Sequence, residues 1–189
     1  MAVHLRDVRP EDKERMRTWR NKPAVSQYMY TDHYVTPEEH ERWFGGIGTD
    51  PTRHYWIIVS DERDVGVLNL MNIDRTNQRC YFGWYIGEES ERGKGVGIAT
   101  EYLLLCHVLE ELKLNKLCAE VLVSNVPVVT LHKSMGFKEE GLLRQHVFKG
   151  GKPADVVTMG ILREEWLAIK PQVEERLREA QSRRARPSS

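Results

Sequence analysis

Apolar residues recur along this chain in short stretches whose spacing alternates between that of strands and that of helices. The run from His54 to Ser60 is almost wholly apolar, which is typical of a strand covered on both faces. Thr36, Pro37 and Glu39 form a capping box, which predicts that a helix begins there. The predicted strands cover 3–8, 54–60, 65–73, 80–87, 116–123, 142–149 and 156–162, and the predicted helices cover 10–20, 37–44, 98–112 and 125–135. This order predicts an α+β fold, a single domain with a mixed central sheet of about seven strands and helices on both faces.

The composition of the chain changes only toward its C-terminus. We therefore assign residues 1–166 to one domain and residues 167–189 to a C-terminal helix followed by a basic, disordered tail. Apolar content falls from Glu174 onward, and residues 183–189 read Arg-Arg-Ala-Arg-Pro-Ser-Ser. A solubilising end accounts for this composition better than a functional basic arm does, although both interpretations stay open.

The charges of the chain balance, with 28 Lys and Arg against 28 Asp and Glu. A dedicated nucleic-acid-binding domain would be clearly basic, so we expect no nucleic-acid partner. No apolar run approaches the about 18 residues of a membrane span, and the first ten residues lack the apolar stretch of a signal peptide. The odd number of cysteines (Cys80, Cys106 and Cys118) argues against a disulfide framework or a zinc site. We therefore expect a cytoplasmic protein without a membrane partner.

A glycine-rich segment separates a predicted strand from a predicted helix in the middle of the chain. Residues 92–97 read Arg-Gly-Lys-Gly-Val-Gly, and the helix that follows carries apolar residues every three or four positions. Alternating glycines let successive backbone N–H groups converge on an anion, and the positive end of the helix adds to the attraction. The expected ligand is a pyrophosphate, with Arg92 and Lys94 adding positive charge. The segment fits neither a P-loop nor a dinucleotide fingerprint, and a glycine turn without a ligand is the alternative.

The same segment resembles a family signature. Residues 92–97 match the Arg/Gln-x-x-Gly-x-Gly/Ala sequence with which the GNAT superfamily of N-acetyltransferases binds acetyl-CoA. Asn125, and the stretch 131–137 that ends in Gly-Phe, agree with the same family, and the resemblance spans roughly Val3 to Trp166. It implies a GNAT-type fold, acetyl-CoA as cosubstrate, no metal ion and a small-molecule amine as acceptor.

The resemblance also implies how the cofactor would be held. Backbone amides of the glycine turn would bind the pyrophosphate, the backbone at Ile86 would pair with the pantetheine arm, and Asn125 would bond the arm from the other side. Asn125 could equally cap the next helix, and the two roles are compatible. The implied cofactor-binding residues are Ile86, Arg92, Gly93, Lys94, Gly95, Val96, Gly97, Asn125 and Lys133.

Acetyl transfer to nitrogen needs an unprotonated amine, a polarised thioester carbonyl and a proton for the leaving thiolate. Direct attack in a ternary complex supplies these without a covalent nucleophile. The resemblance places the proton donor four residues before the glycine of Gly-Phe, where the family usually has Tyr and this chain has His132. An imidazole can fill that role, and a partly exposed helix histidine without a chemical role is the alternative. We assign no base, because Glu120 could equally be a structural hydrogen-bond partner.

The N-terminal third is similar to the acetyltransferases of pseudaminic acid synthesis, which acetylate the 4-amino group of a UDP-linked amino sugar. The similarity lies in Trp19-Arg20-Asn21 and in Glu39-His40 with Trp43-Phe44. Residues 1–22 carry seven cations against four anions, which suits an anionic acceptor. Arg20 and His40 would then bind a phosphate. The alternative for Arg20 is a salt bridge at the end of the helix, and the alternative for His40 is an exposed helix position without a role in binding. The implied substrate-binding residues are Arg20, Asn21, Met29, His40 and Tyr81, the last of which could also be plain sheet packing.

Two other functions stay open from the sequence. The first is a GNAT enzyme that acetylates a ribosomal-protein N-terminus or another small amine, since the Arg-Asn pair also occurs in such enzymes. The second is a non-catalytic sensor that binds acetyl-CoA without turnover. We also expect that a homodimer could form through the last strands.

Overall fold

A seven-stranded mixed sheet runs through the computed structural model, which describes residues 2–185. Its order is β1-β2-β3-β4-β5-β7-β6, and only the β4–β5 pair is parallel. The strands are β1 (Val3–Asp7), β2 (His54–Ser60), β3 (Arg63–Asp74), β4 (Arg79–Ile86), β5 (Lys116–Leu122), β6 (Lys138–Lys149) and β7 (Lys152–Leu162). The α+β prediction of one mixed sheet is confirmed.

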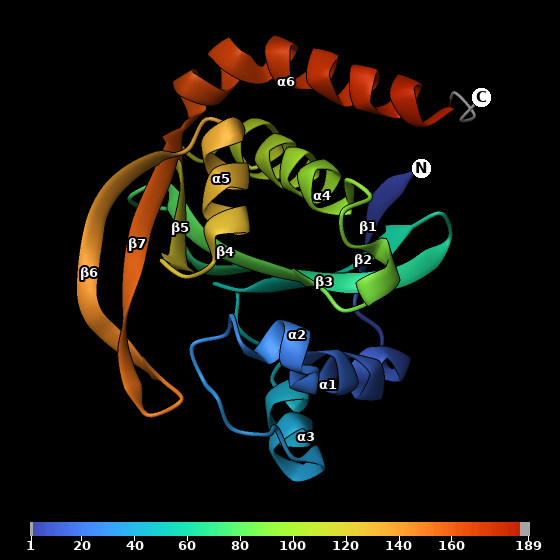
Figure 1. Cartoon of the computed structure of the whole chain (residues 1–189), viewed down its shortest axis with the longest axis vertical. Helices are drawn as coiled ribbons and strands as arrows, with labels where there is room; N and C mark the ends of the chain where they lie inside the picture. The colour runs from blue at the N-terminus through green and yellow to red at the C-terminus, as the bar shows by residue number, and fades with distance from the viewer. Residues whose placement is uncertain (1, 186–189) are drawn as a thin grey trace.

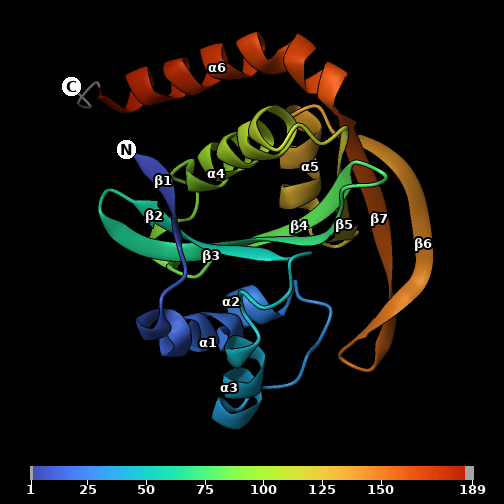
Figure 2. The same ribbon diagram turned by 180° about the vertical axis from the view of Figure 1, so that it is seen from behind.

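Helices cover both faces of this sheet, as Figures 1 and 2 show from opposite sides. Helices α1 (Lys13–Asn21), α2 (Pro23–Ser26) and α3 (Pro37–Gly45) lie on one face, and α4 (Val96–Leu105) and α5 (Val126–Ser134) lie on the other. Short 3₁₀ turns cover Pro10–Asp12 and Glu89–Glu91, and a π-helical turn, Cys106–Glu111, continues α4. Helix α3 begins at the predicted cap, where the Thr36 hydroxyl accepts the backbone N–H of Glu39 at 3.2 Å.

Two apolar cores hold the helices to the sheet. The larger core lies under α4 and α5 and includes Leu68, Leu104 and Leu117, all with 0% exposure. The smaller core lies under α1, where Met16 and Trp19 pack against residues of β2 and β3. Side chains along a strand point alternately to the two faces of the sheet. Strands β2 and β3 therefore contribute residues to both cores, one core on each face.

The C-terminal helix α6 (Arg163–Ala185) lies outside α4, on the far side from the sheet (Figure 1). It begins before the predicted boundary at residue 166, and it buries Trp166 and Val173, with 0% and 1% exposure, in the larger core. The helix therefore contributes apolar side chains to the larger core past residue 166, and the division into a domain and a C-terminal segment stays a prediction. Residues 183–185 of the predicted basic tail belong to α6, and residues 186–189 lie outside the described residues.

The parallel strands β4 and β5 pair only at one end. Their paired residues are Arg79 to Tyr81 and Lys116 to Cys118, and beyond these the strands part. Strand β4 continues to Ile86, still paired with β3, while β5 pairs with β7 up to Leu122. The two strands therefore splay apart, and the splay exposes backbone hydrogen-bonding groups of β4 toward β5.

Candidate active site

The glycine turn lies between the end of β4 and the start of α4. Gly93 and Gly95 have φ values of +73° and +82°, a conformation that favours glycine, and Gly95 is the N-cap residue of α4. A Cβ atom on Gly93 would meet no atom within 4 Å, so this side of the turn is open. A bare turn that leads into the N-terminus of a helix is suited to holding a phosphate group.

The third glycine of the turn serves packing. A Cβ atom on Gly97 would lie 2.9 Å from Trp84 Cη2 and 3.6 Å from Leu131 Cδ2. Gly97 therefore lets the first turn of α4 approach β4 and α5 closely. The sequence predicted the glycine but could not show this neighbour.

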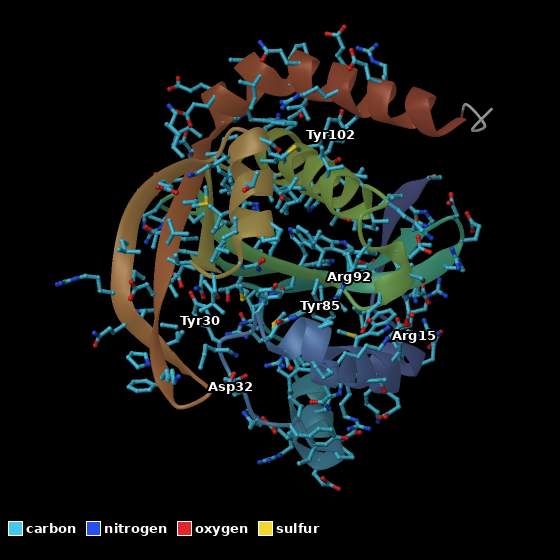
Figure 3. The ribbon with its side chains drawn as sticks, in the orientation of Figure 1. Arg15, Tyr30, Asp32, Tyr85, Arg92 and Tyr102 are labelled. Atoms are coloured by element: carbon cyan, nitrogen blue, oxygen red, sulfur yellow. The ribbon has the colours of Figure 1, made fainter. Side chains whose placement is uncertain are left out.

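The cations of the turn are engaged by protein groups. Arg92 donates from Nε and Nη2 to the Ile86 carbonyl, at 3.2 and 2.8 Å, and so ties the turn to the end of β4 (Figure 3). Lys94 lies 3.3 Å from Glu91, a buried carboxylate that Arg63 also binds at 2.7 Å. These contacts fix the approach to the turn, and cofactor binding by Arg92 and Lys94 stays a prediction.

Ile86 directs its backbone groups into the splay. The next residue, Gly87, donates its N–H to Val65 on the β3 side at 2.8 Å, and neighbouring strand residues point to opposite sides. The Ile86 N–H thus faces the space between β4 and β5. An amide in this position can donate to a carbonyl oxygen lying in the splay.

Asn125 and Lys133 lie at the two ends of α5. Asn125 is the N-cap residue, but its side chain makes no capping hydrogen bond, so only the position of the predicted cap is confirmed. Lys133 is exposed and pairs with Glu139 at 2.8 Å. Their roles toward a cofactor stay predictions.

His132 lies in the interior, with 2% exposure. Its Nδ1 lies 2.8 Å from Glu101 Oε1, and its ring centroid lies 5.4 Å from that of Phe82. Phe82 is the first β4 residue beyond the last pair with β5, so His132 lies beside the point where the two strands part. The alternative of a partly exposed histidine is wrong, because core packing against Phe82 and Phe137 buries the ring.

Arg20 lies on α1, on the opposite face of the sheet from His132. Its Nη2 donates to the carbonyl and the hydroxyl of Thr31, at 3.1 and 2.7 Å. Its Nη1 is buried and has no hydrogen-bond partner among the described residues. Burial lowers the pKa of Arg20 from its ordinary value, because removal from water disfavours the charged guanidinium. An acceptor with anionic oxygens would satisfy this donor.

The structure places His40 in the contact between α3 and α1. The ring is 5% exposed and packs against Trp43 and Phe44, with centroids 4.9 and 6.0 Å away. Nδ1 has no hydrogen-bond partner within residues 2–185, and burial, followed by the charge of Arg17, lowers the pKa of His40. The alternative of a surface helix residue is therefore wrong.

The other predicted acceptor residues have structural contacts. Asn21 donates to and accepts from the backbone of Val35, at 2.9 and 2.8 Å, so a substrate contact would have to replace these bonds. The Met29 carbonyl accepts from Lys149 at 2.7 Å. Tyr81 is the last β4 residue paired with β5, so it stands at the apex of the splay. Substrate binding by these residues stays a prediction.

A loop after α2 crosses to the other end of the sheet, which the sequence did not indicate. Tyr30 donates its hydroxyl to Glu120 on β5 at 2.8 Å, and Asp32 forms an ion pair with Lys149 of the β6–β7 hairpin. Figure 3 shows Tyr30 and Asp32 between that hairpin and the helices α1–α3. These contacts join positions about 90 to 120 residues apart, and no local pattern marks them. Glu120 thus has a structural partner, and it stays a candidate base as well.

Comparison with known proteins agrees with this geometry. Residues 2–138 match the Acetyltransferase (GNAT) domain family. The chain belongs to the GNAT family of acetyltransferases. The acetyltransferase PseH of Campylobacter jejuni is 30% identical over 131 residues, which cover 69% of this chain and 80% of PseH. YdaF of Bacillus subtilis, provisionally named a ribosomal N-acetyltransferase, is 33% identical over 173 residues. The match covers 87% of this chain and 93% of YdaF.

Solved structures show the same fold. The spermidine N-acetyltransferase of Vibrio cholerae, solved with CoA and spermine, superposes with a TM-score of 0.82 at 24% identity. The match covers 87% of this chain and 98% of that one. The predicted GNAT fold and acetyltransferase activity are confirmed, and the family uses acetyl-CoA as its donor. Within residues 2–185, no helix is long and apolar enough to cross a membrane, and no His, Cys, Asp and Glu cluster suits a metal ion.

Proposed function

We propose that this acetyltransferase acetylates the amine of a nucleotide-linked amino sugar, the 4-amino group of a UDP-linked sugar. The observation that carries the proposal is the buried Nη1 of Arg20, which has no hydrogen-bond partner among the described residues. An unsatisfied buried donor costs about 1–3 kcal/mol, more for a charged group, and a diphosphate oxygen would remove that cost. A neutral oxygen would make a weaker hydrogen bond with this donor, and a cationic acceptor would be repelled by the guanidinium.

The roles of the chain in the reaction follow from the site. Amides of the glycine turn hold the pyrophosphate of acetyl-CoA, and the Ile86 N–H polarises the thioester carbonyl in the splay. The acceptor approaches from the face of the sheet that carries Arg20, and its amine attacks directly. His132, on the other face, supplies the proton for the departing thiolate.

Two relatives support different acceptors. The match to PseH, at 30% identity over 69% of this chain, agrees with the resemblance of the N-terminal third to the pseudaminic acid acetyltransferases and so supports the amino sugar. YdaF covers more of the chain and favours a protein N-terminus. A polyamine is disfavoured, because Arg20 places a guanidinium group without a carboxylate hydrogen-bond partner on the acceptor side.

Thiol release from acetyl-CoA tests the proposal with three acceptors: a UDP-linked 4-amino sugar, a ribosomal N-terminal peptide and spermidine. We expect turnover with the UDP sugar, and Arg20→Met should raise its KM by about 10- to 100-fold, the worth of a charge-assisted hydrogen bond. The acetyl-CoA KM should stay within about twofold, since Arg20 lies away from the glycine turn. Arg75→Met, an exposed arginine in the β3–β4 turn, is the control and should change neither constant.

Turnover of the peptide alone would assign a protein substrate instead, and acetyl-CoA binding without any turnover would indicate a sensor. An unchanged KM in Arg20→Met would remove this residue from the acceptor site. The cytoplasmic location and the homodimer stay predictions of the sequence.

A further inference from the structure

Glu101 and His132 form a buried polar pair between α4 and α5. Their exposures are 0% and 2%, and Glu101 Oε1 lies 2.8 Å from His132 Nδ1. The second carboxylate oxygen, Oε2, has no hydrogen-bond partner among the described residues. Replacing a buried ionisable pair by apolar side chains of similar volume is often neutral or stabilising, so packing alone does not account for these two residues.

Because the contact lies at Nδ1, the state of the Glu101 carboxyl group decides which nitrogen of His132 carries a proton. An ionised carboxylate only accepts hydrogen bonds, so the proton between the two groups belongs to Nδ1. In the neutral ring, Nε2 then has a lone pair and nothing to donate. His132 can give a proton from Nε2 only as the imidazolium, whose positive charge the adjacent Glu101 carboxylate balances.

We propose that Glu101 is a positioning residue for acetyl transfer, which holds His132 in the Nδ1–H form and pairs with its charged state. This rests on the proposed function, in which His132 is the proton donor. The amine nitrogen forms the C–N bond, the C–S bond breaks, and its electron pair stays on sulfur. The sulfur takes the Nε2 proton, which leaves neutral His132 still bonded to Glu101. The amine releases a proton to water, and a proton from water restores the imidazolium, so that one proton passes in total from amine to thiol.

A double-mutant cycle tests this inference. Glu101→Gln keeps the size of the side chain and replaces a buried charge by an amide, so the variant should fold, as a thermal melt will show. We expect kcat to fall about 10- to 30-fold with an unchanged KM for acetyl-CoA, because the lost interaction acts on the proton donor and not on binding. In the His132→Ala background the same substitution should cost less than about twofold, since a residue that acts through His132 has nothing left to position.

The exposed pair His107–Glu111 provides the matched control. Its Nδ1 to Oε2 distance is 2.6 Å, and it lies on the π-helical turn that continues α4. Glu111→Gln should leave kcat unchanged. Wild-type kcat in Glu101→Gln, or an equal loss with and without His132, would overturn the proposal.

The tautomer can be measured without any acceptor. In protein labelled with ¹⁵N-histidine, the signals lost in His132→Ala identify this residue, and we expect its bound proton on Nδ1. A wild-type ring that carries its proton on Nε2 alone would overturn the inference. If the wild-type enzyme acetylates none of the three amines, the proposed function fails, and the labelled spectrum still decides the role of Glu101.

Discussion

Gly93 and Gly151 form a matched pair for testing the glycine turn. Their φ values are +73° and +74°, and a Cβ atom on either would meet no atom within 4 Å. An alanine at either position is therefore strained by the same amount, about 1–2 kcal/mol for a left-handed residue. For a protein of this size that strain lowers Tm by about 2–8 °C, and the two variants should lose the same amount.

Only Gly93→Ala should affect the cofactor. Its methyl group would stand in the open side of the turn, where a phosphate oxygen must approach the backbone amides. One lost hydrogen bond to a charged group is worth about 1.5–3 kcal/mol, so the acetyl-CoA Kd should rise about 10- to 100-fold by calorimetry. Gly151→Ala, at the tip of the β6–β7 hairpin, should bind as the wild type does. Equal affinities in the two variants would refute the placement of the pyrophosphate.

Three further outcomes are expected. Gly136→Ala combines φ +96° with a Cβ contact of 2.2 Å to Ile169 Cδ1, so strain and overpacking should together lower the free energy of unfolding by about 2–5 kcal/mol in denaturant titration. The hydrogen bond from Arg6 lowers the pKa of Asp64 in the folded state. The stability that this bond contributes is therefore present above about pH 3.9, the ordinary pKa of Asp, and is lost as the pH falls through the lowered pKa. The difference in Tm between the wild type and Arg6→Gln should accordingly shrink below about pH 3.9. His132→Ala should lower kcat about 100-fold with an unchanged acetyl-CoA Kd, and unchanged turnover would exclude it as proton donor.

The sequence predicted the elements that have local signals. The helix cap at Thr36, the apolar run at His54–Ser60 and the glycines at 92–97 each depend on neighbours within one turn or strand. The extent of α6 was less predictable, because Val173 is buried in the larger core, whose other members lie mostly far from it in the chain. Its charged neighbours made the segment read as solvent-exposed.

In the candidate site, too, the local features could be predicted from the sequence and the long-range contacts could not. Backbone conformation at Gly93 and Gly95 could be predicted from residue type, whereas the carboxylate that binds His132 lies 31 residues away. One signal could have found Glu101. It falls three residues after Ile98 and four before Leu105, on the apolar stripe of the helix, where an unpaired carboxylate would be costly.

The acceptor and cofactor sides are joined by contacts that neither motif contains. Trp19 on α1 donates its indole N–H to Glu88, and Lys22 donates to the Gly87 carbonyl at 2.8 Å. A Cβ atom on Gly87 would lie 2.2 Å from the Trp19 ring, so the chain between β4 and the glycine turn rests directly on α1. Arg20 follows Trp19 on that helix. The segment Gly87–Glu88, which leads from β4 into the glycine turn, therefore also fixes the position of the Arg20 guanidinium. This close packing couples the acceptor side to the cofactor side.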